Sequence, residues 1–422
     1  MSKLFEDLMA RGFIYQSTDE AAVAKLLNGP PVKFYIGFDP TADCLHVGSL
    51  IPIIGMMHMQ RAGHVPIALV GGGTGLVGDP SGKTELRKLL ISQQIGHNLK
   101  SIEGVLRRFL LLDEPHGMVV NNQDWLVDLK YIDFLREIGR HFSVNRMLAA
   151  ESYKARLETG LTFLEFNYML LQSYDFLVLR QKHGCIMQMG GQDQWGNIVA
   201  GIDLVRRVAS EETFGVTFPL LTDSSGNKFG KSVKGAVWLS AEKTPPFEFY
   251  QFWRNVEDHD VGRLLKIYTF LPVEECERLG ALQPPLLNRA KEILAFEVTA
   301  LVHGAAIAAE AFTAATAHFP PSDPDGTVQT SSALASIKKE EGGGLPEVAV
   351  GTSDGTVRIV EALVAAGMAT SNGEAKRLIR QGGVKLNDAS VSDENSLITL
   401  EQLEAGAILK AGKKRMVKLV PA

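Results

Sequence analysis

VKFYIGFDPTADCLHVGS, residues 32–49, is the stretch that decides the fold. Residues 32–38 form a short apolar run with the length of a buried strand. The polar, proline-bearing segment 39–43 ends that strand, and a helical pattern begins near Leu45. Because a strand that turns directly into a helix opens a βαβ unit, this stretch predicts an α/β fold.

The same alternation continues downstream. Residues 65–70 and 118–121 are further apolar segments of strand length, with a long helical pattern over 83–112 between them. The order strand, helix, strand predicts a Rossmann-like parallel sheet that binds nucleotides at the carboxyl ends of its strands. From residue 285 to residue 318 the pattern is wholly helical, which predicts a helical subdomain.

Composition divides the chain further. Residues 320–350 are rich in proline, glycine, serine and charge, with little hydrophobic periodicity, as expected for a linker. Residues 355–422 carry a net charge of +3 against −8 for the rest, which favours a polyanionic partner, although a solvated basic face is the alternative. We predict a Rossmann-like catalytic domain over 1–240, a helical domain over 241–320, a flexible linker over 321–352 and a small α+β domain over 353–422.

The composition excludes several classes of protein. The 422 residues are 45% hydrophobic with a formal net charge of −5, and the apolar runs are far shorter than the about 20 residues of a membrane helix. The first residues lack the pattern of a secretory signal. Cys44, Cys185 and Cys276 are too few and too widely spaced for a disulfide framework or a cysteine zinc site. We expect no membrane, no resident metal and a cytoplasmic location.

Two glycine-rich patterns match nucleotide-binding motifs only in part. GTGLVG at residues 73–78 fits GxGxxG, but DPSG at 79–82 interrupts it before a helix can begin. The following GKT ends as a P-loop does, yet the required first glycine falls on Val77. We interpret these glycines as tight turns with close backbone approach.

The start of the helix near Leu45 has the chemistry of an anion site. His46 and Ser49 are three residues apart and share a face of the first helical turn, and Gly48 leaves space beside them. Backbone N–H groups and the helix dipole favour an anion at this end. The turn can hold a triphosphate with a flat base against the glycine; a surface histidine beside an ordinary cap is the plainer alternative.

A helix expected over 164–177 carries Tyr168, Gln172 and Asp175 on one face. This polar stripe is either solvated or lines a pocket, since a buried aspartate needs a donor, which a ligand phenol or amine can supply. Further on, Asp193 stands where another helix starts, either as a simple cap or as a contact to a ribose or an amino acid.

A polar loop over residues 223–232, DSSGNKFGKS, places Lys228 and Lys231 three residues apart. Solvated lysines on a mobile loop are the usual explanation of such a pattern. The alternative is a loop that closes its ammonium groups on pyrophosphate while charge develops in the transition state.

Taken together, Tyr35, GFDPTAD, HVGS, YMLLQxxD, GGQDQWGN and KFGKS occur in the order and approximate spacing seen in bacterial tyrosyl-tRNA synthetases. The chain resembles that class I family over essentially its whole length. Residues 371–387, SNGEAKRLIRQGGVKLN, resemble an S4 RNA-binding domain. Two motifs differ from the common family pattern: HVGS has Ser49 in place of the second histidine of HIGH, and KFGKS replaces KMSKS.

The resemblance implies a two-step reaction. Tyrosine and ATP, with Mg²⁺ bound to the ATP, give tyrosyl-adenylate and pyrophosphate, and tyrosine then passes to the 3′ end of tRNA(Tyr). It further implies a homodimer in which one tRNA spans both subunits. The tyrosine phenol would meet Tyr35 and Asp175, and its ammonium would meet Asp79, Tyr168 and Gln172.

The remaining implied contacts fall into three sets. Gln188 and Gln194 would complete the tyrosine pocket. ATP would be bound by Gly37, Asp39, His46, Gly48, Ser49, Asp193 and Lys231. The catalytic residues, which would contact the ATP phosphates and the leaving pyrophosphate, would be Thr41, His46, Lys228 and Lys231.

The S4-like segment carries a basic helix. The pattern SNGE at 371–374 predicts a capping box that starts a helix over 372–380. Lys376, Arg377 and Arg380 then project together and are expected to bind RNA through phosphate contacts and shape, with salt-sensitive affinity. An exposed charged helix on a small domain is the alternative.

Three other functions compete with a tyrosine-charging enzyme. The first is a tryptophan-specific synthetase, against which Tyr35 and Asp175 argue. The second is an RNA-binding protein built on a decayed synthetase, against which the retained His46, Lys228 and Lys231 argue. The third is an enzyme that makes adenylates but charges no tRNA, which the basic tail makes less attractive.

Overall fold

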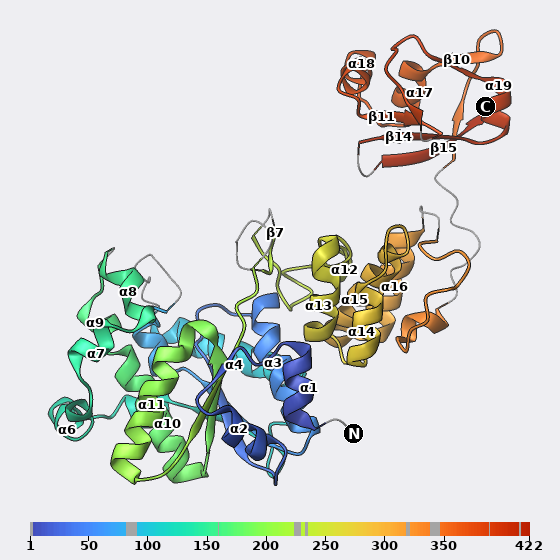
Figure 1. Ribbon diagram of the computed structural model, residues 1–422. Helices are drawn as coiled ribbons and strands as arrows, with labels where there is room; N and C mark the ends of the chain where they lie inside the picture. The colour runs from blue at the N-terminus through green and yellow to red at the C-terminus, as the bar shows by residue number, and fades with distance from the viewer. Residues whose placement is uncertain are drawn as a thin grey trace. The chain divides into compact units, whose positions relative to one another are not determined.

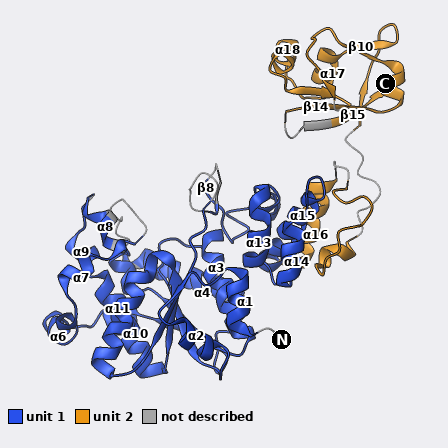
Figure 2. Ribbon diagram, viewed as in Figure 1, with its two compact units in different colours: residues 1–303 blue, residues 304–422 orange. Residues whose placement is uncertain are grey.

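The computed structural model describes residues 3–81, 91–158, 160–222, 229–232, 235–317, 321–337, 347–387, 389–412 and 415–422. The chain divides into two compact units, residues 1–303 and residues 304–422 (Figure 2). Each unit has its own sheet and its own helices, so each is described by itself.

Unit 1 is built on a six-stranded sheet. Its strands, in spatial order, are β1 (Gln16–Ser17), β6 (Phe214–Phe218), β5 (Met187–Gly191), β2 (Lys33–Phe38), β3 (Val65–Val70) and β4 (Met118–Asn121). All neighbours run parallel except β1, which pairs antiparallel with β6 at the edge. The predicted Rossmann-like parallel sheet is confirmed, and the antiparallel edge strand is an addition that the apolar pattern did not indicate.

The strand β2 lies at the switch point of this sheet, because the chain continues from it to β3 on one side and returns through β5 on the other. Helix α3 (Val47–Arg61) packs on β3 and β5, and α11 (Trp195–Ala209) packs on β5 and β6. Figure 1 shows α10 (Tyr168–His183) and α11 on one side of the sheet and α1 (Leu4–Arg11) and α3 on the other. Ligands of doubly wound sheets bind at the carboxyl ends of strands beside such a switch point.

The other helices of unit 1 surround the sheet or follow it in the chain. They are α2 (Glu20–Leu27), α4 (Ser92–Arg107), α5 (Gln123–Leu126), α6 (Tyr131–Glu137), α7 (Val144–Leu148), α8 (Glu151–Leu157), α9 (Phe163–Phe166), α12 (Pro246–Arg254), α13 (Val261–Tyr268), α14 (Val273–Gly280) and α15 (Leu287–His303), with the short strands β7 (Lys231–Ser232) and β8 (Gly235–Ala236) before α12. Among the described residues, no helix has the length and apolar character that crossing a membrane requires.

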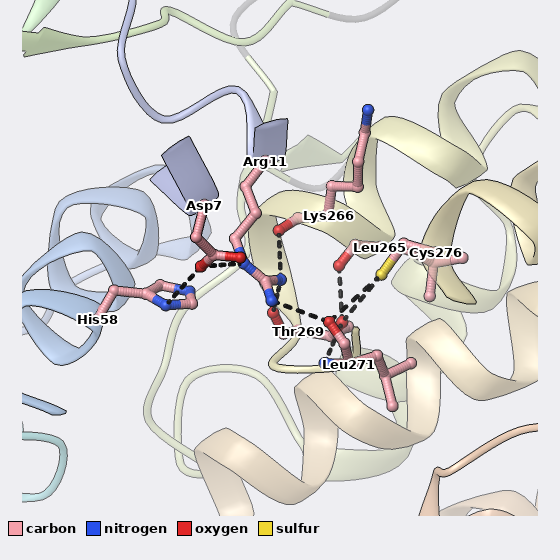
Figure 3. A network of polar contacts seen from close by, with 8 residues as sticks. All are labelled: Asp7, Arg11, His58, Leu265, Lys266, Thr269, Leu271 and Cys276. Carbon is pink, nitrogen blue, oxygen red and sulfur yellow. Dashed lines mark hydrogen bonds and ion pairs between the residues drawn. The ribbon is translucent and has the colours of Figure 1, made fainter. Parts of the chain in front are cut away.

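One buried arginine fastens the amino-terminal helix α1 to the end of α13 (Figure 3). The Arg11 guanidinium, 6% exposed, donates to the carbonyl oxygens of Lys266 (3.3 Å), Thr269 (3.3 Å) and Leu271 (3.0 Å). Its Nε also donates to Asp7 Oδ2 at 2.9 Å. These carbonyls lie at a helix end, where they lack partners within the helix. Arg11 therefore satisfies the end of α13 from a distant part of the chain.

Unit 2 has α+β structure, as predicted for the carboxy-terminal module. Its main sheet has the order β12 (Ala389–Ser390), β11 (Val384–Leu386), β14 (Ala407–Ala411), β15 (Arg415–Pro421), β9 (Glu347–Val350). A second pair consists of β10 (Thr356–Arg358) and β13 (Leu397–Thr399), and the helices are α16 (Ala305–Thr316), α17 (Ile359–Ala365), α18 (Asn372–Arg380) and α19 (Leu400–Glu404). Strand β9 lies inside the range predicted as linker and pairs in parallel with β15. The limits of the four predicted domains remain predictions.

Candidate active site

A cavity of about 480 Å³ in unit 1 is lined by residues of the ends of β2 and β5, of α3 and of α10. Of the residues proposed from the sequence, it brings together Tyr35, Gly37, Asp39, Thr41, His46, Gly48, Ser49, Asp79, Tyr168, Gln172, Asp175, Gln188, Asp193 and Gln194. Lys228 lies outside the described residues, and Lys231 is described only as part of β7. Residues up to 159 positions apart in the sequence therefore line the same cavity.

One end of the cavity pairs a phenol with a carboxyl group. Tyr35, on β2, is buried, and its hydroxyl has no hydrogen-bond partner among the described residues. Asp175 accepts from Asn122 Nδ2 at 3.0 Å and from Trp125 Nε1 at 2.8 Å. Burial raises the pKa of Asp175 to about 8, and these two donors lower it only in part. Because a buried hydroxyl without a partner is costly, this end is suited to a ligand that carries a hydroxyl group.

A second orphaned atom lies nearby on β5. Gln188 is buried, and its Oε1 has no hydrogen-bond partner among the described residues. An amide oxygen is an acceptor only, so it suits a donor of the ligand. The cavity thus offers unused polar atoms of both kinds at buried positions.

A buried carboxyl group marks the corner proposed for an ammonium. Asp79 accepts from Gln194 Nε2 at 2.7 Å and from the backbone N–H of Ser81 at 2.8 Å. Burial raises the pKa of Asp79 to about 6. Nearby, the Tyr168 hydroxyl donates to Asp39 Oδ2 at 2.8 Å, which leaves the hydroxyl oxygen able to accept from a ligand. A cation bound here would restore the charged form of Asp79.

This raised pKa predicts how tyrosine binding depends on pH. An ammonium binds the ionised carboxylate, so the dissociation constant of tyrosine should rise about tenfold between pH 7 and pH 5, as protonation through a pKa of about 6 competes with binding. Equilibrium dialysis checks this, and Asp79→Asn should bind weakly without that dependence. A wild-type constant that stays flat down to pH 5 would contradict the assignment.

The stability of the empty protein has the opposite dependence on pH. The folded pKa of Asp79 lies above its ordinary value of 3.8. Its contribution to stability is therefore fully present below about pH 4 and is lost as the pH rises through about 6.

The sequence pattern predicts His46 within the first turn of the helix. That prediction is wrong by one position, because His46 lies directly before the helix. Helix α3 begins at Val47, and His46 is its N-cap: the His46 Nδ1 accepts from the backbone N–H of Gly48 at 3.0 Å. The N–H of Ser49 donates to the His46 carbonyl at 2.8 Å. A ring nitrogen that accepts a hydrogen bond carries no proton, so the tautomer that makes this cap holds its proton on Nε2. The cap thereby prepares Nε2–H as a donor to an anion.

A family model described as "tRNA synthetases class I (W and Y)" matches residues 27–320, and one described as "Tyrosine--tRNA ligase SYY-like C-terminal domain" matches residues 337–419. The tyrosine--tRNA ligase of Clostridium botulinum strain Hall is 48% identical over 100% of both chains, and that of Clostridium beijerinckii is 50% identical over 99% of both. The chain belongs to the tyrosyl-tRNA synthetase family. The resemblance inferred from the six motifs is confirmed.

Solved structures agree with this family membership. A truncated mitochondrial tyrosyl-tRNA synthetase from Aspergillus nidulans matches with a TM-score of 0.67 and 29% identity, over 75% of this chain and 94% of that one. A tryptophanyl-tRNA synthetase from Encephalitozoon cuniculi, with a TM-score of 0.55 and 13% identity over 74% of this chain and 89% of that one, shares the fold alone. Full-length similarity to tyrosine--tRNA ligases thus decides against the tryptophan-specific alternative.

The glycine segment of this synthetase is a close-packed turn, as interpreted from the sequence. A Cβ added to Gly73 would lie 2.9 Å from Leu126 Cβ, and one added to Gly75 would lie 3.0 Å from Pro40 Cγ. The backbone N–H of Gly73 donates to Asn122 Oδ1 at 2.8 Å. These glycines therefore let the turn after β3 pack closely on the segments that follow β2 and β4, and no dinucleotide motif is needed to explain them.

Four polar residues that support the site were missed in the sequence. Asn122 and Trp125 hold Asp175, Thr74 Oγ1 donates to Asp39 Oδ1 at 2.7 Å, and Asn197 Nδ2 donates to Gln172 Oε1 at 3.0 Å. Asn122 directly follows the predicted strand 118–121, so the rule that ligands meet the carboxyl ends of parallel strands pointed to it. The sequence gives no comparable signal for Trp125.

Gly48 provides a test of the His46 position. A Cβ at Gly48 would lie 2.8 Å from His46 Cε1 and 3.0 Å from its Nδ1. Overpacking of this kind costs about 1–3 kcal/mol, so Gly48→Ala should lower kcat/KM for ATP about tenfold in pyrophosphate exchange. Gly96→Ala is the matched control in helix α4, where an added Cβ meets nothing within 4 Å. Equal kinetics of both variants would show that the ring position does not matter.

The helix predicted in the S4-like module is confirmed, and its cap differs in one detail. Helix α18 spans Asn372–Arg380, and the Ser371 side chain accepts from the N–H of Glu374. The Glu374 carboxylate, however, accepts from the N–H and hydroxyl of Thr370, at 2.8 and 2.6 Å, and not from Ser371. A threonine one position earlier offers two donors where the predicted box offers one.

The three basic residues of α18 are exposed, and two are paired. Arg380 donates to Glu394, and Lys376 Nζ lies 4.0 Å from Glu394 Oε2. Arg377 is exposed on the same helix. The basic face is therefore partly neutralised by one carboxylate, which RNA phosphates would have to displace.

Proposed function

We propose that this chain is a tyrosine--tRNA ligase that activates L-tyrosine with ATP and transfers it to the 3′ end of tRNA(Tyr). The observation that carries the proposal is the buried Tyr35 hydroxyl, which has no partner among the described residues, in one cavity with Asp175. A phenol bound there offers its hydroxyl to both groups, whereas a phenyl ring leaves both groups without this hydrogen-bond partner. The full-length relatives are tyrosine--tRNA ligases, which supports the same substrate.

The residues of the cavity suit adenylate formation. Attack of a carboxylate on the α-phosphate needs alignment and charge neutralisation more than a tuned general base. We assign the Nε2–H of His46 and the hydroxyl of Thr41 to the ATP phosphates, and Lys228 and Lys231 to the leaving pyrophosphate. Gly37, Gly48 and Ser49 would border the nucleotide, and Asp39 and Asp193 would face its ribose side.

Mg²⁺ belongs to the substrate in this proposal. Both oxygens of Asp39 already accept hydrogen bonds, from Thr74 Oγ1 and Tyr168, and Asp79 is likewise occupied by Gln194 and Ser81. Mg²⁺ prefers phosphate oxygens and retained waters in such sites. It would enter as MgATP.

The second step assigns the rest of the chain to tRNA. We propose that the helical range 241–320 meets the anticodon region and that residues 353–422 bind RNA through Lys376, Arg377 and Arg380. Exposed cations bind phosphates with an affinity that falls as salt rises. The buried free thiols of the three cysteines support the cytoplasm as the compartment.

Two assays separate this function from its competitors. Tyrosine-dependent exchange of pyrophosphate into ATP tests the first step, and transfer of labelled tyrosine to tRNA(Tyr) tests the second. We expect both to occur. Exchange without transfer would leave an adenylate-forming enzyme, and neither reaction would leave an RNA-binding relative.

We also propose that the chain is a homodimer, as the resemblance implied. Large apolar side chains are exposed on and beside the short helices α6 to α9, and monomers rarely expose such groups of residues without a partner. They are Val127, Tyr131, Ile132, Val144, Leu157, Phe163 and Leu164.

Ile132→Asp should convert this dimer to a monomer. The side chain is 69% exposed in the single chain, and a buried unpaired charge at an interface costs several kcal/mol. Sedimentation equilibrium measures the mass, with Leu397→Asp as control because Leu397 is also a large apolar side chain, 53% exposed, but lies in unit 2. A wild type that is already monomeric would contradict the proposal.

A further inference from the structure

The residue Trp238 lies directly against the cap of α3 and is not among the residues assigned so far. Its backbone pairs antiparallel with that of His46. The N–H of Val47 donates to the Val237 carbonyl at 2.9 Å, and the N–H of Leu239 donates to the Leu45 carbonyl at 2.9 Å. The segment that follows the lysine loop is thus hydrogen-bonded to both neighbours of His46.

The indole of Trp238 faces the imidazole of His46. The two ring centroids are 6.2 Å apart at an interplanar angle of 68°, an edge-to-face arrangement. Trp238 also lines the cavity. A Cβ at Gly48 would lie 2.8 Å from His46 Cε1. The imidazole therefore lies close to both the backbone of Gly48 and the indole.

A second contact holds the indole itself. Lys243 Nζ lies 5.2 Å from the Trp238 ring centroid, within the range of a cation–π contact. The same Nζ lies 2.6 Å from Asp43 Oδ1, which belongs to the loop just before α3. The backbone N–H of Trp238 donates to Thr244 Oγ1 at 3.0 Å. A chain of contacts therefore links Asp43, Lys243, Trp238 and His46. Its first and last members, Asp43 and His46, both belong to the segment just before α3.

An exposed histidine needs this support if it is to deliver a hydrogen bond. His46 is exposed, and its Nδ1 cap bond to Gly48 leaves the tilt of the ring to its neighbours. Small displacements of an aligning donor cost large factors in rate, and groups that fix its rotamer share in its effect.

We propose that Trp238 is a positioning residue for adenylate formation, acting through His46, and that the Asp43–Lys243 pair fixes the indole. This inference rests on the proposed function, because it gives His46 the role of a donor to ATP. Trp238 itself needs no contact with the reacting atoms. Its effect should fall on kcat and leave the tyrosine pocket unchanged.

Pyrophosphate exchange by the full chain tests this role. An aromatic pair contributes about 0.5–1.5 kcal/mol beyond burial, so Trp238→Ala should lower kcat about three- to tenfold with an unchanged KM for tyrosine. Trp238→Phe, which keeps an aromatic ring, should recover most of the loss. Lys243→Met should cause a smaller loss, and none when added to Trp238→Ala.

A double-mutant cycle with His46→Ala decides the mechanism. If Trp238 acts through His46, Trp238→Ala should have no further effect on kcat in the His46→Ala protein. Additive losses, or a raised KM for tyrosine in Trp238→Ala, would overturn the proposal. Should Trp238→Ala fail to bind tyrosine in dialysis, Lys243→Met replaces it in the same cycle. Absence of exchange in the wild type would instead reject the proposed function.

Discussion

Asp175→Ala is expected to lower kcat/KM for tyrosine activation by a factor of roughly 10²–10³. The change removes a hydrogen bond to the substrate phenol and strands the Asn122 amide and Trp125 indole donors, which now meet Asp175 at 3.0 and 2.8 Å. Such losses amount to about 3–4 kcal/mol at a buried site. Activation of phenylalanine should hardly change, because a phenyl ring makes no such bond. The variant should therefore lose most of its discrimination.

Steady-state pyrophosphate exchange with both amino acids measures this effect. Asp203→Ala is a suitable control, since Asp203 on α11 pairs with surface arginines, including Arg206 at 2.9 Å, and does not line the active-site cavity. It should leave tyrosine activation within about twofold of the wild type, as expected for a partly exposed ion pair away from the cavity. An equal drop for tyrosine and phenylalanine in Asp175→Ala would indicate general damage to the fold.

Arg11→Met is expected to destabilise unit 1 by about 3–5 kcal/mol. The guanidinium lies buried and supplies hydrogen bonds to three carbonyl oxygens at the end of α13 as well as to Asp7. Methionine fills a similar volume but leaves the carboxylate and the carbonyls without their donor, and loss of one partner of a buried ion pair costs this much. Burial, together with the nearby charge of Arg11, lowers the pKa of His58 to about 3, so His58, 3.8 Å from Asp7, is neutral at pH 7 while Arg11 is in place.

Urea unfolding followed by circular dichroism measures this loss. Arg107→Met is a matched control, because Arg107 makes the same ion pair across one helical turn, with Glu103 at 2.9 Å, but is 39% exposed. Exposed pairs contribute about 0–1 kcal/mol, so the control should unfold near the wild-type midpoint. Similar midpoints for both variants would mean that the Arg11 network does not hold α1 against α13.

Much of the fold could be predicted because local pattern and tertiary packing agree. The apolar segments 65–70 and 118–121 became β3 and β4 with the predicted limits, and 32–38 became β2 with one residue less. Helices were harder. The expected helix over 164–177 is two helices that meet at Asn167, and a capping box at Thr162 starts the first of them.

A glycine also set a helix limit that the sequence pattern did not predict. The wholly helical range 285–318 breaks at Gly304, whose φ of +96° a helix cannot contain. The pattern of that range predicts one apolar stripe of Leu294, Val298, Leu301 and Val302; Leu301 is partly buried and the other three are buried. Periodicity therefore identified the buried face correctly but not the break in the backbone.

The residues of the candidate site also fall into those that the sequence predicted and those that it did not. Most polar groups that line the cavity were found, because their chemistry stands out at the ends of strands and on polar helix faces. Trp125 and Trp238 were not found, because each acts on a side chain that a different part of the chain supplies: Trp125 on Asp175 and Trp238 on His46. Contacts of this kind follow from the three-dimensional arrangement and leave no local pattern.

The most direct test of the central claim is exchange of pyrophosphate into ATP by the wild-type chain, with tyrosine, phenylalanine and tryptophan measured side by side. The pairing of Tyr35 and Asp175 around a phenol predicts rapid exchange with tyrosine and almost none with the other two. Equal exchange with phenylalanine, or no exchange with any of the three, would contradict it.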